Sequence, residues 1–298
     1  MEGQLTDRIA IGVDLGGTKI RVAGVTSKGE IIGSPVNIET EAHREKEIVE
    51  NNIFRSIKEV LEREKLATKE ILGIGIGSPG PLDLKTGTIL NAPNLLSLNQ
   101  YPLKKQVAEK FSTPVFVEND GNCFALGEAM FGCGKGASIV VGLTLGTGLG
   151  CGIVMDGKVY HGATGTAAEI WKTPYQEKRF EEIVSGKGVA EIYERKKAIK
   201  IDAKQVLERA VKGEVAALES WKEFGFHLGN VLAFIINLLD PDMIVLGGSI
   251  SKAFNYFKES METTCRMNVN SLPADHVKIK RSLLGSDAGL LGAAALCF

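Results

Sequence analysis

The chain has 298 residues, of which 44% are hydrophobic and 24% charged, and its formal net charge at pH 7 is −1. This length suggests about two domains with packed cores, and the near-neutral charge argues against a nucleic-acid-binding surface or a polybasic patch for anionic membranes. The longest apolar stretch, residues 231–239, is too short to span a bilayer, and the polar residues 1–8 lack the core of a signal peptide, so we expect a cytoplasmic protein.

Apolar residues in the first part of the chain recur with the periods of short strands and amphipathic helices. Strands are predicted at residues 9–14, 20–25, 31–36, 72–76 and 115–117, and helices at 48–63, 104–111 and 121–131. Glycine turns between the first strands are typical of an antiparallel meander. The order as a whole is mixed α/β.

The second part of the chain begins with another strand-rich stretch that resembles the opening meander. Strands are predicted at residues 138–145, 151–155 and 243–246, and helices at 181–196, 203–212, 215–239 and 288–296. The apolar residues 231–239 are more simply core than interface. Two α/β halves of this kind would leave between them a cleft in which ligands commonly bind.

Two glycine-threonine turns each follow an apolar, strand-like run. They are Asp14-Leu15-Gly16-Gly17-Thr18-Lys19 and Leu145-Gly146-Thr147-Gly148. Glycine lets backbone N–H groups approach an anion closely and threonine adds a hydroxyl donor, so two such turns could grip a nucleotide polyphosphate. The alternative is a pair of ordinary hairpin turns in a glycine-rich protein.

One further glycine motif formally fits the dinucleotide fingerprint Gly-x-Gly-x-x-Gly. It spans residues 75–80 after a predicted strand, but Pro79 and Pro81 bracket its last glycine, where a helix should open. No acidic residue ends a second strand about 20 positions further on. We therefore do not expect a dinucleotide site there.

Six motifs, taken in order, resemble the ROK family (repressors, open reading frames and sugar kinases) within the actin-like ATPase and hexokinase superfamily. They are Gly12-Val13-Asp14-Leu15-Gly16-Gly17-Thr18-Lys19, Ser78-Pro79-Gly80-Pro81-Leu82-Asp83, Asn91-Ala92-Pro93-Asn94-Leu95, Glu118-Asn119-Asp120-Gly121-Asn122, Leu145-Gly146-Thr147-Gly148 and Leu246-Gly247-Gly248-Ser249. The resemblance covers almost the whole chain. It implies a two-domain α/β, actin-like ATPase (ribonuclease H-like) fold with duplicated mixed sheets and an interdomain cleft. The expected domains are residues 1–118 with 287–298, and residues 119–286.

The resemblance also implies a reaction, which is transfer of the ATP γ-phosphoryl group to a sugar hydroxyl, commonly O6 of a hexose or amino-hexose. Such transfer needs phosphate-binding backbone, a magnesium ion and a carboxylate near the attacking hydroxyl. By similarity that carboxylate is Asp120, acting as general base, although locally it also suits a helix N-cap. Asn119 would bind sugar hydroxyls, or serve only as a turn residue, and Gly80 and Asn94 would contact the sugar.

The nucleotide contacts implied by the resemblance lie in both halves of the chain. Gly16, Gly17 and Thr18 would approach the β- and γ-phosphates, and Asp14 would hold Mg²⁺ through water. Three residues, Gly146, Thr147 and Gly148, would bind phosphate from the facing domain, and Gly247 and Gly248 would lie against the adenosine. ATP and Mg²⁺ are thus the expected cofactors.

The sequence departs from the family pattern between residues 167 and 186. A Gly-Glu-Ile-Gly-His motif, a cysteine-rich zinc knuckle and Cys-x-Glu are usual there, whereas this chain has no cysteine between Cys151 and Cys265, so we expect no zinc. Glu169 and Glu181 still align with carboxylates that bind the sugar near its anomeric end. Lys172 takes the place of the histidine, and Trp171, in place of a glycine, either fills the space of the lost loop or stacks on the sugar.

Two other functions are compatible with the fold. A sugar sensor without turnover would keep the sugar pocket, and a DNA-binding regulator would carry a helix-turn-helix module, for which the 13 residues before Asp14 leave no room. An actin-like ATPase acting on a protein is disfavoured by the sugar-side motifs. The expected partners are ATP and a sugar of open identity, glucose being the default, with neither nucleic acid nor membrane; similar proteins often form homodimers.

Overall fold

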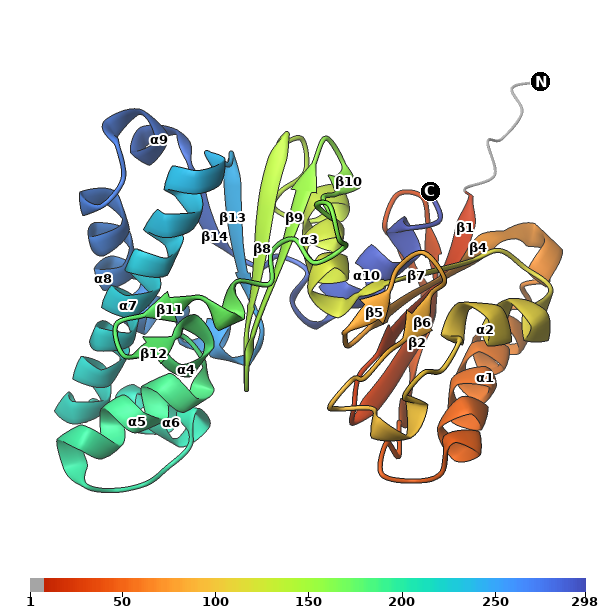
Figure 1. The fold of residues 1–298 in the computed structure, drawn as a ribbon, viewed down its shortest axis with the longest axis horizontal. Helices are drawn as coiled ribbons and strands as arrows, with labels where there is room; N and C mark the ends of the chain where they lie inside the picture. Colours follow the sequence, from red (N-terminus) through yellow and green to blue (C-terminus); the bar gives the residue numbers. More distant parts are fainter. Residues whose placement is uncertain (1–7) are drawn as a thin grey trace. The chain divides into compact units, whose positions relative to one another are not determined.

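The structure, a computed structural model, describes residues 8–298, so the signal-peptide argument concerns residues that lie almost wholly outside this range. The chain forms two compact units (Figure 1). The first comprises the chain up to Lys135 together with His161–Gly165 and Ser286–Phe298, and the second comprises Gly136–Tyr160 and Thr166–Gly285. Between residues 8 and 298, no helix is both long and apolar enough to cross a membrane.

The first unit is built on a five-stranded mixed sheet with the order β3-β2-β1-β4-β7. Its strands are β1 (Ile9–Leu15), β2 (Lys19–Thr26), β3 (Ile31–Glu39), β4 (Ile71–Ser78) and β7 (Val115–Asn119), and a small hairpin pairs β5 (Leu82–Asp83) with β6 (Thr88–Ile89). Strands β1 to β3 form an antiparallel meander, while β4 and β7 run parallel to β1. The predicted strands of this half are all present.

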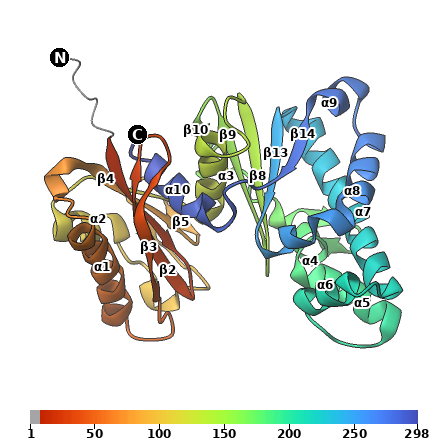
Figure 2. The same cartoon turned by 180° about the vertical axis from the view of Figure 1, so that it is seen from behind.

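Helices cover both faces of this sheet. They are α1 (Lys46–Arg63), α2 (Leu103–Phe111), α3 (Asp120–Phe131) and α10 (Ala288–Ala295), with short 3₁₀ turns η1 (Thr68–Glu70), η2 (Leu96–Leu98) and η5 (Gly285–Asp287). Alternate residues of a strand point to opposite faces. Ile11 and Val13 share a core with Ile53 of α1, which lies along β2 and β3 (Figure 2). The opposite face receives α3 and α10.

Glycines make this second face accessible to the helices. A Cβ atom on Gly12 would lie 2.4 Å from the carbonyl oxygen of Leu290, and one on Gly75 would lie 1.8 Å from that of Ala293. On Gly77 it would meet the Cys123 sulfur at 3.0 Å. The glycines of the dinucleotide-like motif therefore serve helix packing, and β4 is followed by the β5–β6 hairpin rather than by a helix.

The second unit contains a five-stranded sheet with the order β10-β9-β8-β13-β14. Its strands are β8 (Ile139–Leu145), β9 (Leu149–Met155), β10 (Lys158–Val159), β13 (Met243–Gly247) and β14 (Lys278–Arg281), and β11 (Pro174–Tyr175) pairs with β12 (Lys178–Arg179) in a separate hairpin. The helices are α4 (Phe180–Ile183), α5 (Gly186–Lys197), α6 (Ala203–Val211), α7 (Val215–Leu239), α8 (Phe254–Met267) and α9 (Ser271–His276), with 3₁₀ turns η3 (Ile170–Lys172) and η4 (Ser249–Ala253).

The two large sheets repeat one plan. Each sheet contains an antiparallel meander, β1–β2–β3 or β8–β9–β10, and two further strands that run parallel to one another, β4 and β7 or β13 and β14. The first strand of the meander lies beside this parallel pair and runs parallel to it. The first turn of each meander carries the glycine-threonine motif. The expected duplication of mixed α/β sheets is confirmed.

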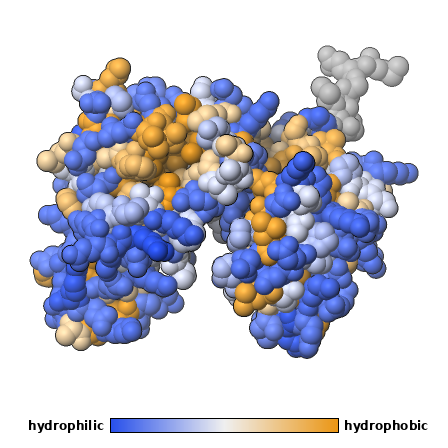
Figure 3. All heavy atoms as spheres, viewed as in Figure 1, coloured by the Kyte–Doolittle hydropathy of each residue, from blue (hydrophilic) through white to orange (hydrophobic). Residues whose placement is uncertain are grey.

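The long helix α7 packs closely on α8. A Cβ on Gly225 would lie 2.4 Å from the Phe257 carbonyl oxygen, and one on Gly229 would lie 2.6 Å from that of Met261, so both glycines permit the approach. The C-terminal stretch of α7 is only partly core, because Phe234 and Leu238 are exposed. Figure 3 shows such apolar areas scattered among hydrophilic residues on one face.

One helix prediction in the second half was wrong. The single helix expected at residues 181–196 is interrupted, because Ser185 is extended and the Gly186 N–H donates to the carbonyl oxygen of Gly146, 2.8 Å away. Helices α8 and α9 and strand β14 were not predicted. The two units differ from the expected domain limits because residues 119–135, 161–165 and 286 belong to the first unit, where α3 packs against α10.

Candidate active site

The carboxyl edge of the first sheet gathers the acidic residues singled out in the sequence. Asp14 on β1 is paired with Gly77 on β4, which is paired with Glu118 on β7. The three strands are parallel, so their carboxyl ends meet at one edge, where ligands of α/β sheets commonly bind. Asp120 follows directly as the first residue of α3 and is exposed.

Asp14 is a strained carboxylate in electrostatic terms. Its pKa is raised from 3.8 to about 6, first by burial and then by the negative charge of Asp120, while the guanidinium of Arg21 acts in the opposite direction. The mutual repulsion indicates that the Asp14 and Asp120 side chains share one electrostatic environment. A bound cation would relieve it, and carboxylate oxygens suit Mg²⁺.

Arg21 is a residue of this site that the sequence analysis missed. It lies opposite Asp14 in the β1–β2 pairing, and its Nη2 is 2.5 Å from Oδ1 of Asp287, just before α10. The register of the β1–β2 hairpin, residue 14 against residue 21, would have given the pairing of Arg21 with Asp14. The ion pair of Arg21 with Asp287 joins positions too far apart in sequence for any local pattern to reveal.

The turn at Gly16, Gly17 and Thr18 is held from outside. The backbone N–H of Thr40 donates to the carbonyl oxygen of Thr18 at 3.0 Å, and the Thr40 hydroxyl donates to the carbonyl oxygen of Gly16 at 2.6 Å. Within the turn, the Gly16 N–H donates to the carbonyl oxygen of Lys19. A Cβ on Gly17 would lie 2.7 Å from the backbone oxygen of Asn94. The predicted phosphate turn and the predicted sugar contact Asn94 are thus neighbours.

A hollow of about 340 Å³ opens beside Asn94. His43, from the loop between β3 and α1, lines it together with Leu96 and Ser97. The Ser97 hydroxyl donates to the carbonyl oxygen of Ala42 at 3.3 Å and so holds the two loops together. His43 carried no signal in the sequence beyond its residue type.

Asn119, rather than Asp120, is the N-cap of α3. Its Oδ1 accepts the Gly121 N–H at 2.9 Å, and Oδ1 of Asp120 lies 2.8 Å from the same nitrogen. A Cβ on Gly80 would lie 3.2 Å from Nδ2 of Asn119, so the glycine leaves room for the amide. Gly80, Asn119 and Asp120 therefore form one cluster in the first unit.

The second unit gathers its own predicted residues around the turn between β8 and β9. The Gly146 N–H donates to Gly148 at 3.0 Å, as Gly16 does within the first turn. Gly248 has φ +78°, and a Cβ there would lie 2.3 Å from the Leu145 carbonyl oxygen. Gly247 ends β13, and Thr147 at the tip of the turn is exposed.

Glu181 supports this turn directly. Its Oε2 accepts the Leu149 N–H at 3.1 Å, and a Cβ on Gly148 would lie 2.5 Å from the same oxygen. Burial first, and then the charge of Glu169, raise the pKa of the Cys151 thiol on β9 to about 12. Both glutamates predicted to bind sugar therefore lie near β9, Glu181 at its start and Glu169 beside Cys151.

The residues that replace the family Gly-His pair interact with one another. Trp171 donates its indole N–H to the carboxylate of Glu169, and Nζ of Lys172 lies 4.7 Å from the centre of the Trp171 ring. The tryptophan is half-buried and packs against the core of the second unit. Packing thus accounts for part of its surface, and its indole orients Glu169.

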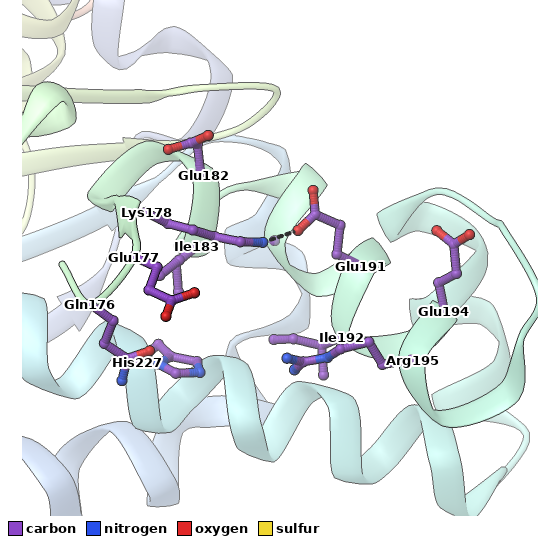
Figure 4. A pocket seen from close by; sticks show the side chains of 11 residues that line it. Gln176, Glu177, Lys178, Glu182, Ile183, Glu191, Ile192, Glu194, Arg195 and His227 are labelled. Atoms are coloured by element: carbon purple, nitrogen blue, oxygen red, sulfur yellow. Dashed lines mark hydrogen bonds and ion pairs between the residues drawn. The ribbon is translucent and has the colours of Figure 1, made fainter. Parts of the chain in front are cut away.

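A separate cavity of about 510 Å³ lies between the β11–β12 hairpin, α5 and α7 (Figure 4). Lys178 pairs with Glu191 across it, and Arg195 and His227 line its floor. Burial, the largest influence, lowers the pKa of His227. None of the residues that line this cavity is one of the predicted site residues.

No group of three or more His, Cys, Asp and Glu side chains that could hold a metal ion occurs in the part of the chain that the structure describes. The hairpin β11–β12 lies in the stretch between Cys151 and Cys265, which contains no cysteine. Asp14, next to the charge of Asp120, is a residue whose chemistry would suit a divalent cation.

Comparison with known proteins places the chain among sugar kinases and their relatives. It is 32% identical to a glucokinase of Halalkalibacterium halodurans, over 97% of this chain and 94% of that protein. It is 29% identical to a xylose repressor of Caldicellulosiruptor bescii, over 96% of this chain and 77% of the repressor. A ROK family glucokinase from Streptomyces griseus, solved with glucose and AMPPNP, superimposes with a TM-score of 0.80 at 29% identity, over 97% of this chain and 98% of that one.

These similarities confirm the actin-like ATPase fold expected from the motifs, with its duplicated mixed sheets. The sequence profile of the ROK family matches residues 10–298, which is nearly all of the chain. The protein therefore belongs to the ROK family.

Proposed function

We propose that this protein is an ATP-dependent sugar kinase that transfers the γ-phosphoryl group to a hydroxyl of a hexose or amino-hexose, O6 being the favoured position. The observation that carries the proposal is the joint placement of Asp14 and Asp120 at the carboxyl edge of the first sheet. Phosphoryl transfer depends on positioning and charge stabilisation, which these carboxylates and the neighbouring glycine turn can supply. The glucokinase relatives support the same reaction.

Asp120 is assigned as the general base. Its position at the start of α3 leaves the carboxylate exposed, so it can accept the proton of the attacking hydroxyl as the new P–O bond forms. Asn119 uses its Oδ1 to cap α3, which leaves Nδ2, beside Gly80, to donate to a sugar oxygen. We assign Asn94 to the same sugar pocket because it adjoins the phosphate turn at Gly17.

We assign the glycine-threonine turns to the phosphates of ATP. In the first turn the N–H groups of Gly17 and Thr18 and the threonine hydroxyl are the donors, since the Gly16 N–H donates within the turn. Asp14 would hold Mg²⁺, either directly or through water. When bound, the ion would neutralise charge on the phosphate oxygens.

The second unit supplies the remaining contacts of the proposal. The turn at Gly146, Thr147 and Gly148 would bind phosphate, and Gly247 and Gly248 would adjoin the adenosine. Glu181 is tied to Leu149, while Glu169 is held by Trp171, so both carboxylates are oriented to accept hydrogen bonds from sugar hydroxyls.

A coupled assay of ADP release over a panel of sugars tests this proposal. The panel contains glucose, mannose, glucosamine, N-acetylglucosamine and N-acetylmannosamine, and ³¹P–¹H correlation of the product identifies the phosphorylated oxygen. Asp120→Asn should lower kcat by roughly 10²- to 10⁴-fold without lowering the thermal midpoint, because it removes a charge that repels Asp14. The control is Asp275→Asn, which removes an exposed carboxylate on α9.

A non-catalytic sugar sensor is the competing function, and the similarity to a xylose repressor is the observation that favours it. The two functions differ in turnover. If one sugar of the panel binds tightly in calorimetry and no sugar of the panel stimulates ADP release, the sensor function is established and the kinase function is refuted.

A further inference from the structure

Glu118 is a buried carboxylate immediately before the proposed sugar-binding and catalytic pair Asn119 and Asp120. Only 4% of it is exposed. Its Oε1 accepts the backbone N–H of Asn119 at 2.8 Å and the side-chain amide of Asn122 at 2.9 Å. Its Oε2 lies 2.5 Å from Nε2 of His161. Because an ionised carboxylate only accepts hydrogen bonds, His161 is the donor in this last contact.

His161 reaches Glu118 from a distant part of the chain. Residues His161–Gly165 belong to the first unit, although the segments before and after them belong to the second. A Cβ on Gly165 would lie 3.5 Å from Cδ1 of Leu84, so the far end of this short segment also lies against the first unit. The segment therefore brings a histidine to a buried carboxylate 43 positions earlier in sequence.

We propose that His161 is a positioning residue for Asp120, acting through Glu118. The inference rests on the proposed kinase function, because it assigns His161 to the same reaction. Hydrogen bonds to ionised groups are short and strong, and a buried acceptor that loses its donor is costly. Without His161, the Glu118 carboxylate would turn toward another donor or toward water.

Such a turn acts directly on the catalytic segment. Oε1 of Glu118 holds the Asn119 N–H, and Asn119 in turn caps α3 through Gly121. A shift of the cap moves Asp120, the first residue of the helix. A displacement of about 1 Å at a reacting group can lower the rate by roughly 10²-fold.

The alternative role for His161 is purely structural, as an ion pair that fastens residues 161–165. A matched control separates the two roles, because His276 makes a similar contact to Asp242 in the second unit, with Nε2 and Oδ1 2.8 Å apart. The test compares His161→Ala, His161→Gln and His276→Ala in steady-state kinetics, with the sugar that the wild type phosphorylates. The thermal midpoint of each variant is measured alongside.

His161→Ala should lower kcat by roughly 10- to 100-fold while the KM values for sugar and ATP change less than about threefold. His161→Gln, which keeps an N–H donor, should recover most of the loss, and His276→Ala should leave kcat unchanged. A drop in thermal midpoint with normal kcat would overturn the proposal. So would a higher sugar KM at normal kcat, which would make His161 a sugar contact instead.

Two further measurements test the route through Glu118. In a Glu118→Gln background, His161→Ala should cost less than about threefold in kcat, because non-additivity marks residues that act together. An undiminished effect would refute the route. Independently of activity, NMR hydrogen exchange of the Asn119 and Gly121 amides should be at least about tenfold faster in His161→Ala and unchanged in His276→Ala. If hydrogen exchange is unchanged in both variants, the inference about His161 is overturned, whether or not a sugar is phosphorylated. A failure to phosphorylate any sugar would by itself refute only the kinase proposal.

Discussion

Asp14→Asn is the substitution whose effect on stability follows most directly from the electrostatics of the carboxyl edge. The pKa of Asp14 is raised from 3.8 to about 6, first by burial and then by the charge of Asp120, so the folded protein binds a proton at this site more tightly than the unfolded chain. At about 1.4 kcal/mol for each tenfold change in proton affinity, ionising Asp14 lowers the free energy of unfolding by about 3 kcal/mol.

The sign of the pH dependence follows from this direction. Below pH 3.8 Asp14 is protonated in both states, between pH 3.8 and about 6 the unfolded chain has already lost the proton, and above pH 6 both states are ionised. Stability therefore falls as pH rises through this window and stays lower above it. Because asparagine cannot ionise, Asp14→Asn should raise the free energy of unfolding by up to about 3 kcal/mol at pH 8, and by about half as much at pH 5.

Urea denaturation at pH 5 and pH 8 measures this difference, with Asp242→Asn as a control of opposite sign. Hydrogen bonds from the Ile139 backbone and His276 lower the pKa of Asp242, so its ionised form stabilises the fold and its replacement should destabilise the protein at pH 8. Asp14→Asn should also abolish turnover. If it proves no more stable than the wild type at pH 8, or if its advantage does not shrink at pH 5, the account of Asp14 as a strained carboxylate is refuted.

Three further substitutions test packing, the second turn and specificity. Gly75→Ala places a Cβ 1.8 Å from the Ala293 carbonyl oxygen and should destabilise the fold by about 3 kcal/mol or more, which urea denaturation would detect; an effect below about 1 kcal/mol would contradict close packing of α10 on β4. Gly148→Ala should displace the Glu181 carboxylate, 2.5 Å away, and raise the KM for ATP through the turn and the KM for sugar through Glu181, with little loss of thermal midpoint; an unchanged KM for ATP would separate this turn from the nucleotide. Lys172→His introduces the histidine that the motif resemblance implies at this position and should change the ranking of kcat/KM over the sugar panel; an unchanged ranking would remove position 172 from the sugar pocket.

Most of the first unit could be predicted from the sequence because its strands and helices carry strong local signals. Helix α7 also begins and ends where its periodicity predicts, at Val215 and Leu239. Helix α8 was missed although Phe257, Met261 and Cys265, spaced four residues apart, are all buried. This apolar spacing is a local signal for a helix in the sequence.

Strand β14 is different, because nothing in its sequence predicts it. Ile279 is its only hydrophobic residue and is half-buried, among two exposed lysines and an exposed arginine. It forms a strand because β13 offers a parallel partner along Met243 to Leu246. Tertiary context of this kind overrides local propensity and cannot be seen in a short window.

The candidate site divides in the same way. Asp14, Asp120 and the glycine turns belong to contiguous motifs, whereas Arg21 and His161 gain their importance only from pairing across the fold. Arg21 requires the register of a hairpin, and His161 requires the return of a short segment to the first unit. The pairing of Arg21 with Asp14 can be derived once the hairpin register is fixed, whereas the contact of His161 with Glu118 is not encoded by spacing along the chain.

The duplicated sheets also indicate why the proposed chemistry is asymmetric. Thr144 in β8 corresponds to Asp14 in β1, because each lies two positions before the first glycine of its turn. Thr144 is paired with Gly150 on β9, whereas Asp14 is paired with Arg21 on β2. The backbone plan is thus repeated, but the charged pair is not. A neutral copy can bind phosphate through N–H groups and hydroxyls, but the Thr144 hydroxyl supplies no negative charge to balance a bound cation and does not act as a base at neutral pH. General base and metal site should therefore both reside in the first unit, and Thr144→Asp, which adds a carboxylate to the neutral copy, should weaken ATP binding by repelling its phosphates.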